Sequence, residues 1–456
     1  MHSSPSRFYF SRLALAIAFV LSAATAFAQD NPLAQIEQNS GVSKIRLAAA
    51  DFKATSAGES ETAVDKRVFD TTLFNDLQNA GIFDLVSKST IPLASPGFPA
   101  EINLSQWASA PANAAFVAFG NFSVQSGRLV VNGFLDDAKN TQFPQVFAKQ
   151  YNEEASEDQA RQIAHRFADE IIYRLGGGTP GIAESKIFYI KMTGGGNKEV
   201  WEMDYDGANQ HAITHLGSDS ISPRVSPDNS RIAFSTLGKI GFQLHMYSML
   251  LGRDITFPGS AGSNISPAWS SDGRQLAFSS SRDGRNNIWV SDPDGRLAHK
   301  ITNYGSDVSP TWNPRTNAQI AFISGRSRLP QLYMMDSDGS AIQRLTDGGY
   351  VSSPSWSPNG QFIAFAWDRK YGPGAPGGQD IYIISTVPKT DGTYPWIQLT
   401  HDQGACDFPT WSPDGRHITY ANGRGANTRI MTMLFDGTLN HPLTGAGADM
   451  PNWSWK

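Results

Sequence analysis

The side chains best suited to chemistry in this 456-residue chain are few, and their spacing does not favour a catalytic site. Cys406 is the only cysteine and lies close to His401, and a Cys–His pair can form an activated thiolate nucleophile. The two residues precede a Pro-x-Trp strand, so we interpret Cys406 as an incidental loop thiol. His211 and His215 flank a short strand, where residues four apart are separated by about 13 Å, too far to share a metal ion.

Other motifs that could bind a ligand are better interpreted as turns. The Asp-Gly segments 292–297 and 336–341 resemble calcium-binding loops but lack the later glutamate that completes such a loop. The Gly-rich segment 194–198 lies between two expected strands and predicts a hairpin turn, not a phosphate-binding loop. The sequence has no His-Glu-x-x-His, Walker A or Gly-x-Ser-x-Gly motif. We therefore expect a protein that is not an enzyme and uses no cofactor or metal.

One pattern recurs along the latter part of the chain: a Ser-Pro-x-Trp segment, a Ser-Pro-Asp-Gly turn and an Ile-Ala-Phe run. The first prolines of the copies are Pro223, Pro267, Pro310, Pro354, Pro409 and Pro451. Their successive differences are 44, 43, 44, 55 and 42 residues. A period of about 40–45 residues with several short strands per unit is typical of β-propeller blades. In each turn, proline suits an early position and glycine suits the position that needs a positive φ.

The two ends of the repeat complement each other. Residues 187–215 supply the second, third and fourth strands of a unit, and the C-terminal segment 450–456 supplies a lone first strand. Joined, they make one more blade, so the sequence predicts a six-bladed β-propeller closed by the C-terminal strand. An open β array is the alternative, but complementary ends favour a ring, which leaves only short protected edges.

A different pattern precedes the repeat and predicts an α/β domain over residues 44–175. A helical stripe of apolar residues ends at Gly81 and indicates a helix over 64–81. A second helix is expected over 156–175, opened by a capping box of Ser156 and Gln159. Strands are expected at 44–52, 82–88, 114–122, 127–137 and 145–151.

The N-terminus predicts export. Arg7 and Arg12 precede an apolar core that ends in a small-x-small pattern, so we expect a signal peptide cleaved after Ala28. An uncleaved anchor is the alternative, but the core is short for a membrane span. The predicted division is a signal peptide (1–28), a mobile tail (29–43), the α/β domain (44–175), a Gly-rich linker (176–181) and the propeller (182–456).

Composition narrows the classes of partner. The formal net charge is −5, so no basic excess indicates nucleic-acid binding. A single cysteine excludes intrachain disulfides, so burial of the core must stabilise the fold. No later apolar run is long enough to cross a bilayer. We expect an exported, monomeric protein without direct membrane insertion.

Loops that join the outer strand of one blade to the inner strand of the next should gather on one face, around the central axis. Small and polar residues dominate these loops, which suits the docking of a protein or ligand. Short loops that merely tolerate change are the alternative interpretation. The expected mouth loops are 218–221, 260–265, 305–308, 348–352, 402–407 and 445–449.

The domain order resembles one known family. A signal peptide, an α/β domain of this size and six units such as "SPSWSPNGQFIAF" (353–365) resemble the TolB family, and residues 73–89 are similar to its helix–strand segment. The resemblance covers essentially the whole mature chain. It implies a non-catalytic periplasmic component of the Tol-Pal system, which supports outer-membrane integrity and cell division. A periplasmic propeller hydrolase, or a peptidase- or glycan-binding module, is the alternative.

The same resemblance implies two partners. The peptidoglycan-associated lipoprotein Pal would bind at the propeller mouth. The inner-membrane protein TolA would bind the mature amino terminus and the amino-terminal domain. Carried over by position, the Pal site falls on loops before the prolines, at Ser263, Asn264, Ser266, Val308, Ser309, Tyr350 and Asp407.

Overall fold

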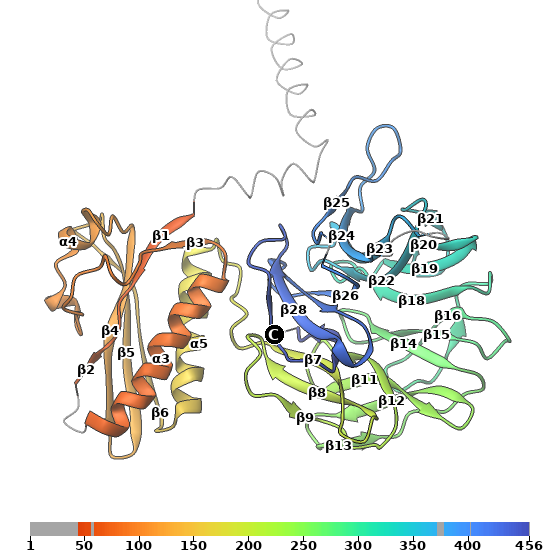
Figure 1. Ribbon diagram of the computed structural model, residues 1–456, viewed down its shortest axis with the longest axis horizontal. Helices are drawn as coiled ribbons and strands as arrows, with labels where there is room; N and C mark the ends of the chain where they lie inside the picture. Colours follow the sequence, from red (N-terminus) through yellow and green to blue (C-terminus); the bar gives the residue numbers. More distant parts are fainter. Residues whose placement is uncertain (1–43, 56–58, 372–377, 402, 456) are drawn as a thin grey trace, which may run out of the picture.

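The computed structural model describes residues 44–55, 59–371, 378–401 and 403–455 (Figure 1). The predicted signal peptide, its cleavage after Ala28 and the tail at 29–43 lie outside the described residues and stay predictions. Within the described part, no helix has both the length and the apolar character needed to span a bilayer.

Residues 45–175 form a mixed sheet covered on both faces. The strand order is β3-β1-β4-β5-β6, with β2 paired to β4. Helices α3 and α5 lie between this sheet and the second part of the chain, and α4 packs on the opposite face (Figure 1). The elements are β1 (Ile45–Ala49), β2 (Lys53–Ala54), α3 (Glu59–Asn79), β3 (Phe83–Leu85), η1 (Pro99–Glu101), α4 (Leu104–Ala108), β4 (Phe116–Gln125), β5 (Arg128–Asp137), β6 (Gln145–Glu154) and α5 (Glu157–Leu175).

The two long helices follow the predicted apolar stripes, with one difference. Helix α3 begins at Glu59 instead of residue 64, because its first turn carries no apolar residue and gives no periodic signal. At α5 the Ser156 Oγ accepts the backbone N–H of Gln159 at 3.1 Å, as the capping motif predicts. Phe69 of α3 and Phe167 of α5 are fully buried against the sheet. The short helix α4 was not expected.

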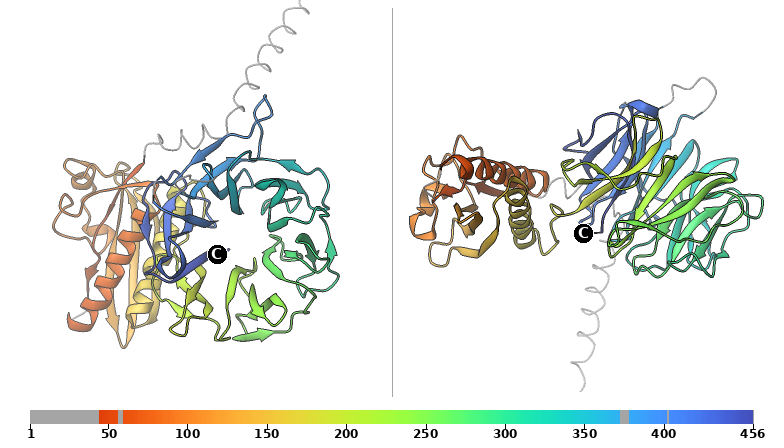
Figure 2. Two further views of the ribbon diagram at one scale, coloured as in Figure 1. Left: turned by 45° about the vertical axis from the view of Figure 1, so that its right-hand side comes forward. Right: turned by 90° about the horizontal axis from the view of Figure 1, so that it is seen from below.

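Six four-stranded sheets follow and close into a ring around a central opening (Figure 2). Strand β30 pairs with β7, so the C-terminal strand completes the sixth blade and confirms the predicted closure. Each blade is antiparallel, from an innermost first strand to a short outer fourth strand. Blade 1 consists of β10 (Ser220–Val225), β11 (Arg231–Gly238), β12 (Gly241–Ser248) and β13 (Arg253–Ile255), and blade 2 consists of β14 (Asn264–Trp269), β15 (Leu276–Ser280), β16 (Asn287–Ser291) and β17 (His299–Lys300). Blade 3 consists of β18 (Asp307–Trp312), β19 (Gln319–Ser327), β20 (Leu329–Asp336) and β21 (Gln343–Arg344), and blade 4 consists of β22 (Tyr350–Trp356), β23 (Phe362–Asp368), β24 (Asp380–Ser385) and β25 (Trp396–Gln398). Blade 5 consists of β26 (Cys406–Trp411), β27 (His417–Asn422), η2 (Gly425–Asn427), β28 (Arg429–Leu434) and β29 (His441–Pro442), and blade 6 consists of β30 (Ala448–Trp453), β7 (Lys186–Met192), β8 (Lys198–Asp204) and β9 (His211–Ala212).

The tryptophan of the repeat joins neighbouring blades. The indole N–H of Trp312 in blade 3 donates to the backbone oxygen of Ala268 in blade 2 at 3.1 Å. The same bond recurs at three more junctions, each to the residue between Pro and Trp of the preceding blade. The pairs are Trp269–Arg224, Trp356–Thr311 and Trp411–Ser355, at 3.0, 3.1 and 3.1 Å. The repeat therefore supplies both the packing and a polar contact between blades.

A strained backbone conformation that was not predicted also repeats in every blade. The residue before each first proline has a φ between 50° and 54°, in the left-handed region. The register between the first and second strands shifts at this point in all six blades. Each first strand thus contains a β-bulge, and Pro310, Pro354 and Pro409 line the central channel. The residues concerned are Ser222, Ser266, Ser309, Ser353, Phe408 and Met450.

We expect Ser309→Val to lower the free energy of unfolding by about 1–2 kcal/mol, because a β-branched side chain is disfavoured at a left-handed position. Urea denaturation followed by tryptophan fluorescence would measure the change. Ser309→Ala keeps a Cβ without the branch and is the matched control, and Ser309→Gly should be tolerated. Equal losses for Val and Ala would show that backbone strain is not the cause.

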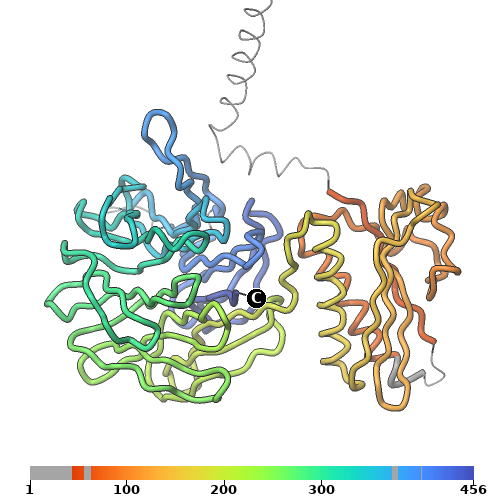
Figure 3. The backbone as a smooth tube through the Cα atoms, turned by 180° about the vertical axis from the view of Figure 1, so that it is seen from behind, coloured from red at the N-terminus to blue at the C-terminus, as the bar shows by residue number. Residues whose placement is uncertain are grey.

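The two parts of the chain pack through α3 and α5 against blades 5 and 6. His417 Nε2 lies 2.7 Å from the backbone oxygen of Asn79, and Arg416 donates to the oxygen of Gly176 at 3.3 Å. Arg161 of α5 forms an ion pair with Asp204 of β8 at 3.4 Å. Figure 3 shows the chain leaving α5 and entering the propeller, where β7, the second strand of blade 6, comes next. The α/β part therefore covers blades 5 and 6 on this side of the ring. The candidate site lies at the mouth formed by the loops before the first strands.

Candidate functional site

The seven predicted site residues sit at the start of four inner strands. The prediction that they lie in loops is wrong for six of them, because the first strands begin before the bulge and not at the proline. Only Ser263 precedes its strand. Asn264 and Ser266 belong to β14, Val308 and Ser309 to β18, Tyr350 to β22 and Asp407 to β26.

Five of these residues make contacts within the propeller or hold its backbone conformation. Asn264 is 2% exposed, and its side chain contacts Gln243 and Arg282. Ser263 accepts the N–H of Phe242 through its Oγ at 3.2 Å. Ser266 and Ser309 occupy the strained bulge position, and Val308 packs against the core between blades 3 and 4. These five therefore shape the mouth more than they present groups to a partner.

Tyr350 is different, because it belongs to an exposed aromatic cluster. Its ring centroid lies 5.3 Å from that of Tyr371, and the two residues are 38% and 54% exposed. A further exposed ring, Tyr304, precedes the first strand of blade 3, the blade before, and is also 54% exposed. Tyrosine at an interface supplies a large contact area with little loss of conformational entropy.

Arginines stack on aromatic rings around the same mouth. The guanidinium of Arg282 lies 4.3 Å from the Trp289 ring, and that of Arg326 lies 5.2 Å from the Tyr304 ring. Arg369 lies 4.3 Å from the Trp396 ring. These contacts hold the side chains in place. Arg326 also forms an ion pair with buried Asp307 at 3.0 Å, and Arg282 donates to the Ser260 hydroxyl at 3.0 Å, whereas Arg369 is exposed. We call the set Arg282, Tyr304, Arg326, Tyr350, Arg369 and Tyr371 the mouth rim.

The arginines were not predicted, although the sequence carries a signal for them. The predicted site was confined to the loops before the first strands, whereas the arginines lie near or just beyond the ends of the second strands, which reach the same face. An arginine stands four positions after the aromatic residue of the second strand in four consecutive units. The pairs are Phe278 and Arg282, Phe322 and Arg326, Phe365 and Arg369, and Tyr420 and Arg424.

Asp407 acts mainly within its own strand. Its Oδ1 accepts the backbone N–H of Phe408 at 2.7 Å and the hydroxyl of Ser352 at 3.1 Å. Asp449 accepts the N–H of Met450 in the same way at 2.8 Å. Burial raises the pKa of both carboxyl groups above the ordinary range. Aspartate thus supports the bulge in the two blades that lack serine before proline.

Cys406 is not the loop thiol that the sequence suggested. It is the first residue of β26 and is fully buried between blades 4 and 5. Burial raises the pKa of its thiol, which disfavours the reactive thiolate. Among the residues that the structure describes, no three His, Cys, Asp or Glu side chains converge in a way that could hold a metal ion.

Comparison with known families agrees with this architecture. Residues 173–456 match the family model described as PD40, TolB beta propeller domain. The chain belongs to the TolB β-propeller family. The resemblance inferred from the repeat and from the domain order is thereby confirmed.

Curated TolB relatives are similar over part of their length. A "Protein TolB homolog" from Chlorobium chlorochromatii is 31% identical over 201 residues, which is 44% of this chain and 44% of the relative. A "Tol-Pal system protein TolB" from Desulfosudis oleivorans is 31% identical over 267 residues, or 57% of this chain and 58% of the relative. The chain spans about half the length of the curated relatives it matches.

A solved TolB structure extends the likeness beyond the propeller. The crystal structure of TolB from Acinetobacter baumannii superposes with a TM-score of 0.73, covering 90% of this chain and 97% of that chain. The sequence identity is 22%, so the comparison establishes the fold alone. The shared fold includes the α/β part as well as the six blades.

Proposed function

We propose that this chain is a non-catalytic periplasmic scaffold of the Tol-Pal system. In this proposal it supports outer-membrane integrity and cell division by binding Pal at the propeller mouth and TolA through its amino-terminal part. Residues 44–175 and 182–456 act as two domains joined by the linker 176–181, and the chain works as a monomer. The observation that carries the proposal is the cluster of tyrosines and stacked arginines at the mouth rim. The proposal also rests on relatives of this chain that are named Tol-Pal system protein TolB.

The composition of the rim supports a protein partner. Tyrosine, tryptophan and arginine are the side chains enriched among the residues that dominate binding energy at protein interfaces. Here they gather on one face, and their stacked geometry reduces the entropy lost on binding. Within the original seven residues, Tyr350 is the one that we expect to contribute most directly to Pal binding, while the others hold the rim in shape.

The geometry also supports a scaffold over the alternative of a hydrolase. Asp407 and Asp449 are two acidic groups of the inner strands on the mouth side. Their Oδ1 atoms accept backbone N–H groups at the bulges, so both carboxyl groups stabilise the local backbone. A general acid or base must instead be within reach of a substrate proton, so these contacts favour a scaffold over a hydrolase.

We expect Tyr350→Ala combined with Arg369→Glu to weaken binding of the purified Pal-like lipoprotein at least tenfold, or about 1.4 kcal/mol. The double substitution removes an exposed ring and reverses an exposed charge on the rim. Isothermal titration calorimetry with the exported full chain would measure the dissociation constant. Asp407→Arg is a poorer test, because it also removes the acceptor for Phe408 N–H.

Arg253→Glu provides the matched control for this experiment. Arg253 is exposed on β13, the outer strand of blade 1, and the substitution makes the same charge change away from the rim. Its affinity for the lipoprotein should equal that of the unaltered chain. Unchanged binding of the rim variant would exclude this face as the Pal site.

For TolA, we propose contacts with the tail at 29–43 and with the α/β domain. A chain lacking residues 29–43 after export should lose binding to the periplasmic domain of a TolA-like protein while retaining the lipoprotein. Loss of both partners would instead indicate a folding defect, which thermal denaturation would reveal.

A further inference from the structure

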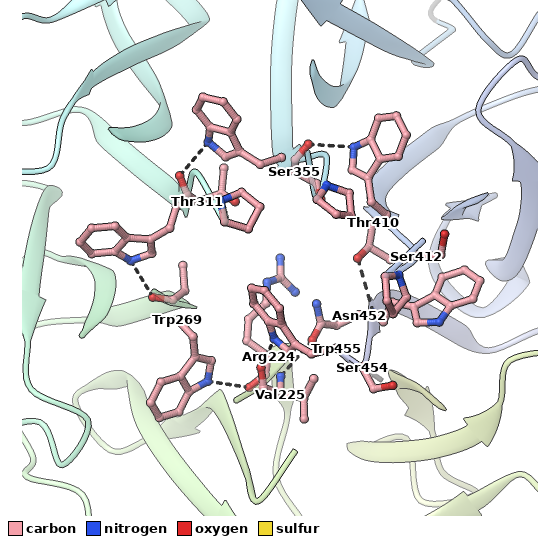
Figure 4. A pocket seen from close by; sticks show the side chains of 18 of the residues that line it. Arg224, Val225, Trp269, Thr311, Ser355, Thr410, Ser412, Asn452, Ser454 and Trp455 are labelled. Atoms are coloured by element: carbon pink, nitrogen blue, oxygen red, sulfur yellow. Dashed lines mark hydrogen bonds between the residues drawn. The ribbon is translucent and has the colours of Figure 1, made fainter. Parts of the chain in front are cut away.

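The central channel contains a cavity at the end opposite the mouth (Figure 4). Its volume is about 180 Å³, and tryptophans and prolines line it together with hydroxyl and amide side chains such as Thr410, Ser412 and Asn452. Walls that combine flat apolar rings with a few polar groups suit a small ligand with a planar or aliphatic body and a polar end. Trp455 and Pro413 also line a second cavity, between α5 and the propeller, so the channel end borders the groove between the two parts of the chain.

One charged side chain faces this cavity from blade 1. Arg224 donates through Nη1 to the backbone oxygen of Pro223 at 2.8 Å. Within the described part of the chain, no carboxylate forms an ion pair with it. Burial lowers the pKa of its guanidinium to about 10, and no neighbouring charge counteracts this effect. Figure 4 shows Arg224, Asn452 and Trp455 reaching toward the middle of the ring.

The fold does not require a charge at this position. Arg224 stands between the first proline and the position of the repeated tryptophan. Its equivalents in the other five blades are small or uncharged residues, namely Ala268, Thr311, Ser355, Thr410 and Asn452. The contact that the fold uses here is the backbone oxygen, which accepts the N–H of Trp269 at 3.0 Å. Arg224 is partly buried, and a cation without a counter-ion in such a place costs free energy that a bound anion would offset.

We propose that this cavity is a carboxylate-binding site in which Arg224 holds the anionic group. A guanidinium presents a planar fork that matches a carboxylate with two hydrogen bonds. The cavity admits a body no larger than about a benzene ring, which fits an engineered cavity of ~150 Å³ in another protein. The ligand is therefore a small organic acid, or the C-terminal carboxylate of an extended peptide. This site is separate from the mouth and does not depend on the proposed Pal and TolA partners.

Benzoate is a suitable probe because its ring fits the walls and its carboxylate matches Arg224. We expect benzoate to bind the full chain saturably, seen as a change in tryptophan fluorescence and by calorimetry. Arg224→Gln should weaken this binding at least tenfold, and the exposed control Arg253→Gln should leave it unchanged. Benzamide, the neutral analogue, should bind at least tenfold more weakly than benzoate to the unaltered chain.

Thermal denaturation separates a ligand site from a structural role. Without ligand, Arg224→Gln should unfold at the same temperature as the unaltered chain or at a higher one, because an unpaired charge is removed. A lower unfolding temperature, or equal benzoate binding in both chains, would overturn the proposal. Equal affinity for sulfate at matched ionic strength would also overturn the assignment to carboxylates.

Two peptide probes distinguish the sources of the carboxylate. An acetylated Gly-Phe peptide with a free C-terminus is compared with its amidated form. Binding of the free form more tightly than benzoate, with the same dependence on Arg224, would identify a peptide terminus as the ligand. Binding of benzoate alone would identify a small organic acid, and failure of both probes would overturn the proposal.

Discussion

Trp312→Ala is expected to lower the free energy of unfolding by about 3–5 kcal/mol, the usual cost of truncating a buried aromatic side chain. Trp312 is 3% exposed and packs with Ala268 and Ile320 at the junction of blades 2 and 3. The substitution also leaves the Ala268 oxygen without its indole donor. Urea denaturation followed by far-ultraviolet circular dichroism would measure the loss.

Two further variants separate packing from hydrogen bonding in this test. Trp312→Phe keeps most of the ring but removes the N–H donor, so the expected loss is about 1–2 kcal/mol. Trp396→Ala truncates a tryptophan that is 36% exposed on an outer strand and should cost less than Trp312→Ala. If Trp312→Ala and Trp396→Ala were equally destabilised, the tryptophan bonds between blades would not be the main source of ring stability.

The bond between blades changes at the two junctions of the closing blade. In blade 6, Trp453 donates to the Ser185 hydroxyl at 2.7 Å instead of to blade 5. In blade 1, Val225 occupies the tryptophan position, and its backbone N–H donates to Asn452 Oδ1 at 2.9 Å. The indole of Trp455 then donates to the Val225 oxygen at 3.2 Å. The blade made from both ends of the propeller therefore closes the ring through contacts of its own.

The sequence predicted the architecture well because the architecture is repetitive. Six copies of one pattern reveal the blade, and complementary ends reveal the closure, without knowledge of any tertiary contact. The bulge before each proline escaped notice, since a left-handed serine leaves no mark on hydrophobic periodicity. The start of α3 was missed for a related reason, because its first turn lacks apolar residues.

The candidate site was harder to predict than the fold. Tyr350 was included because the family's Pal site, carried over by position, falls on the segments before the prolines. Arg369 and its equivalents were missed because they lie near or just beyond the end of the second strand of each blade. Only the three-dimensional fold brings that end and the loops before the first strands to one face. Arg224 was missed because its place between proline and tryptophan indicated architecture alone.

Asp76→Ala is expected to lower the free energy of unfolding by about 3–5 kcal/mol, because it breaks a buried polar network between the two parts of the chain. Asp76 of α3 lies 2.7 Å from His165 Nδ1 of α5, and Tyr205 of the propeller donates to its other oxygen at 2.5 Å. All three residues are buried. Removal of the carboxylate leaves an imidazole and a phenol without their partner. Differential scanning calorimetry should show the variant unfolding at a lower temperature.

The pH dependence of this loss of stability tests whether the Asp76 carboxylate, paired with His165, is its cause. Burial alone would lower the pKa of His165, but the hydrogen bond and the charge of Asp76 raise it above the ordinary value. Because the pKa of His165 is higher in the folded state than in the unfolded state, protonated His165 stabilises the fold. This contribution is fully present below the unfolded-state pKa of about 6.5, and it is lost as the pH rises through the folded-state pKa. The gap in stability between Asp76→Ala and the unaltered chain should therefore be largest near pH 5.5 and should narrow toward alkaline pH. Asp76→Asn keeps an acceptor for Tyr205 and removes only the charge, so its deficit should be smaller than that of Asp76→Ala but narrow over the same range. A deficit independent of pH in both variants would mean that packing, and not the ion pair with His165, joins the α/β part to the propeller.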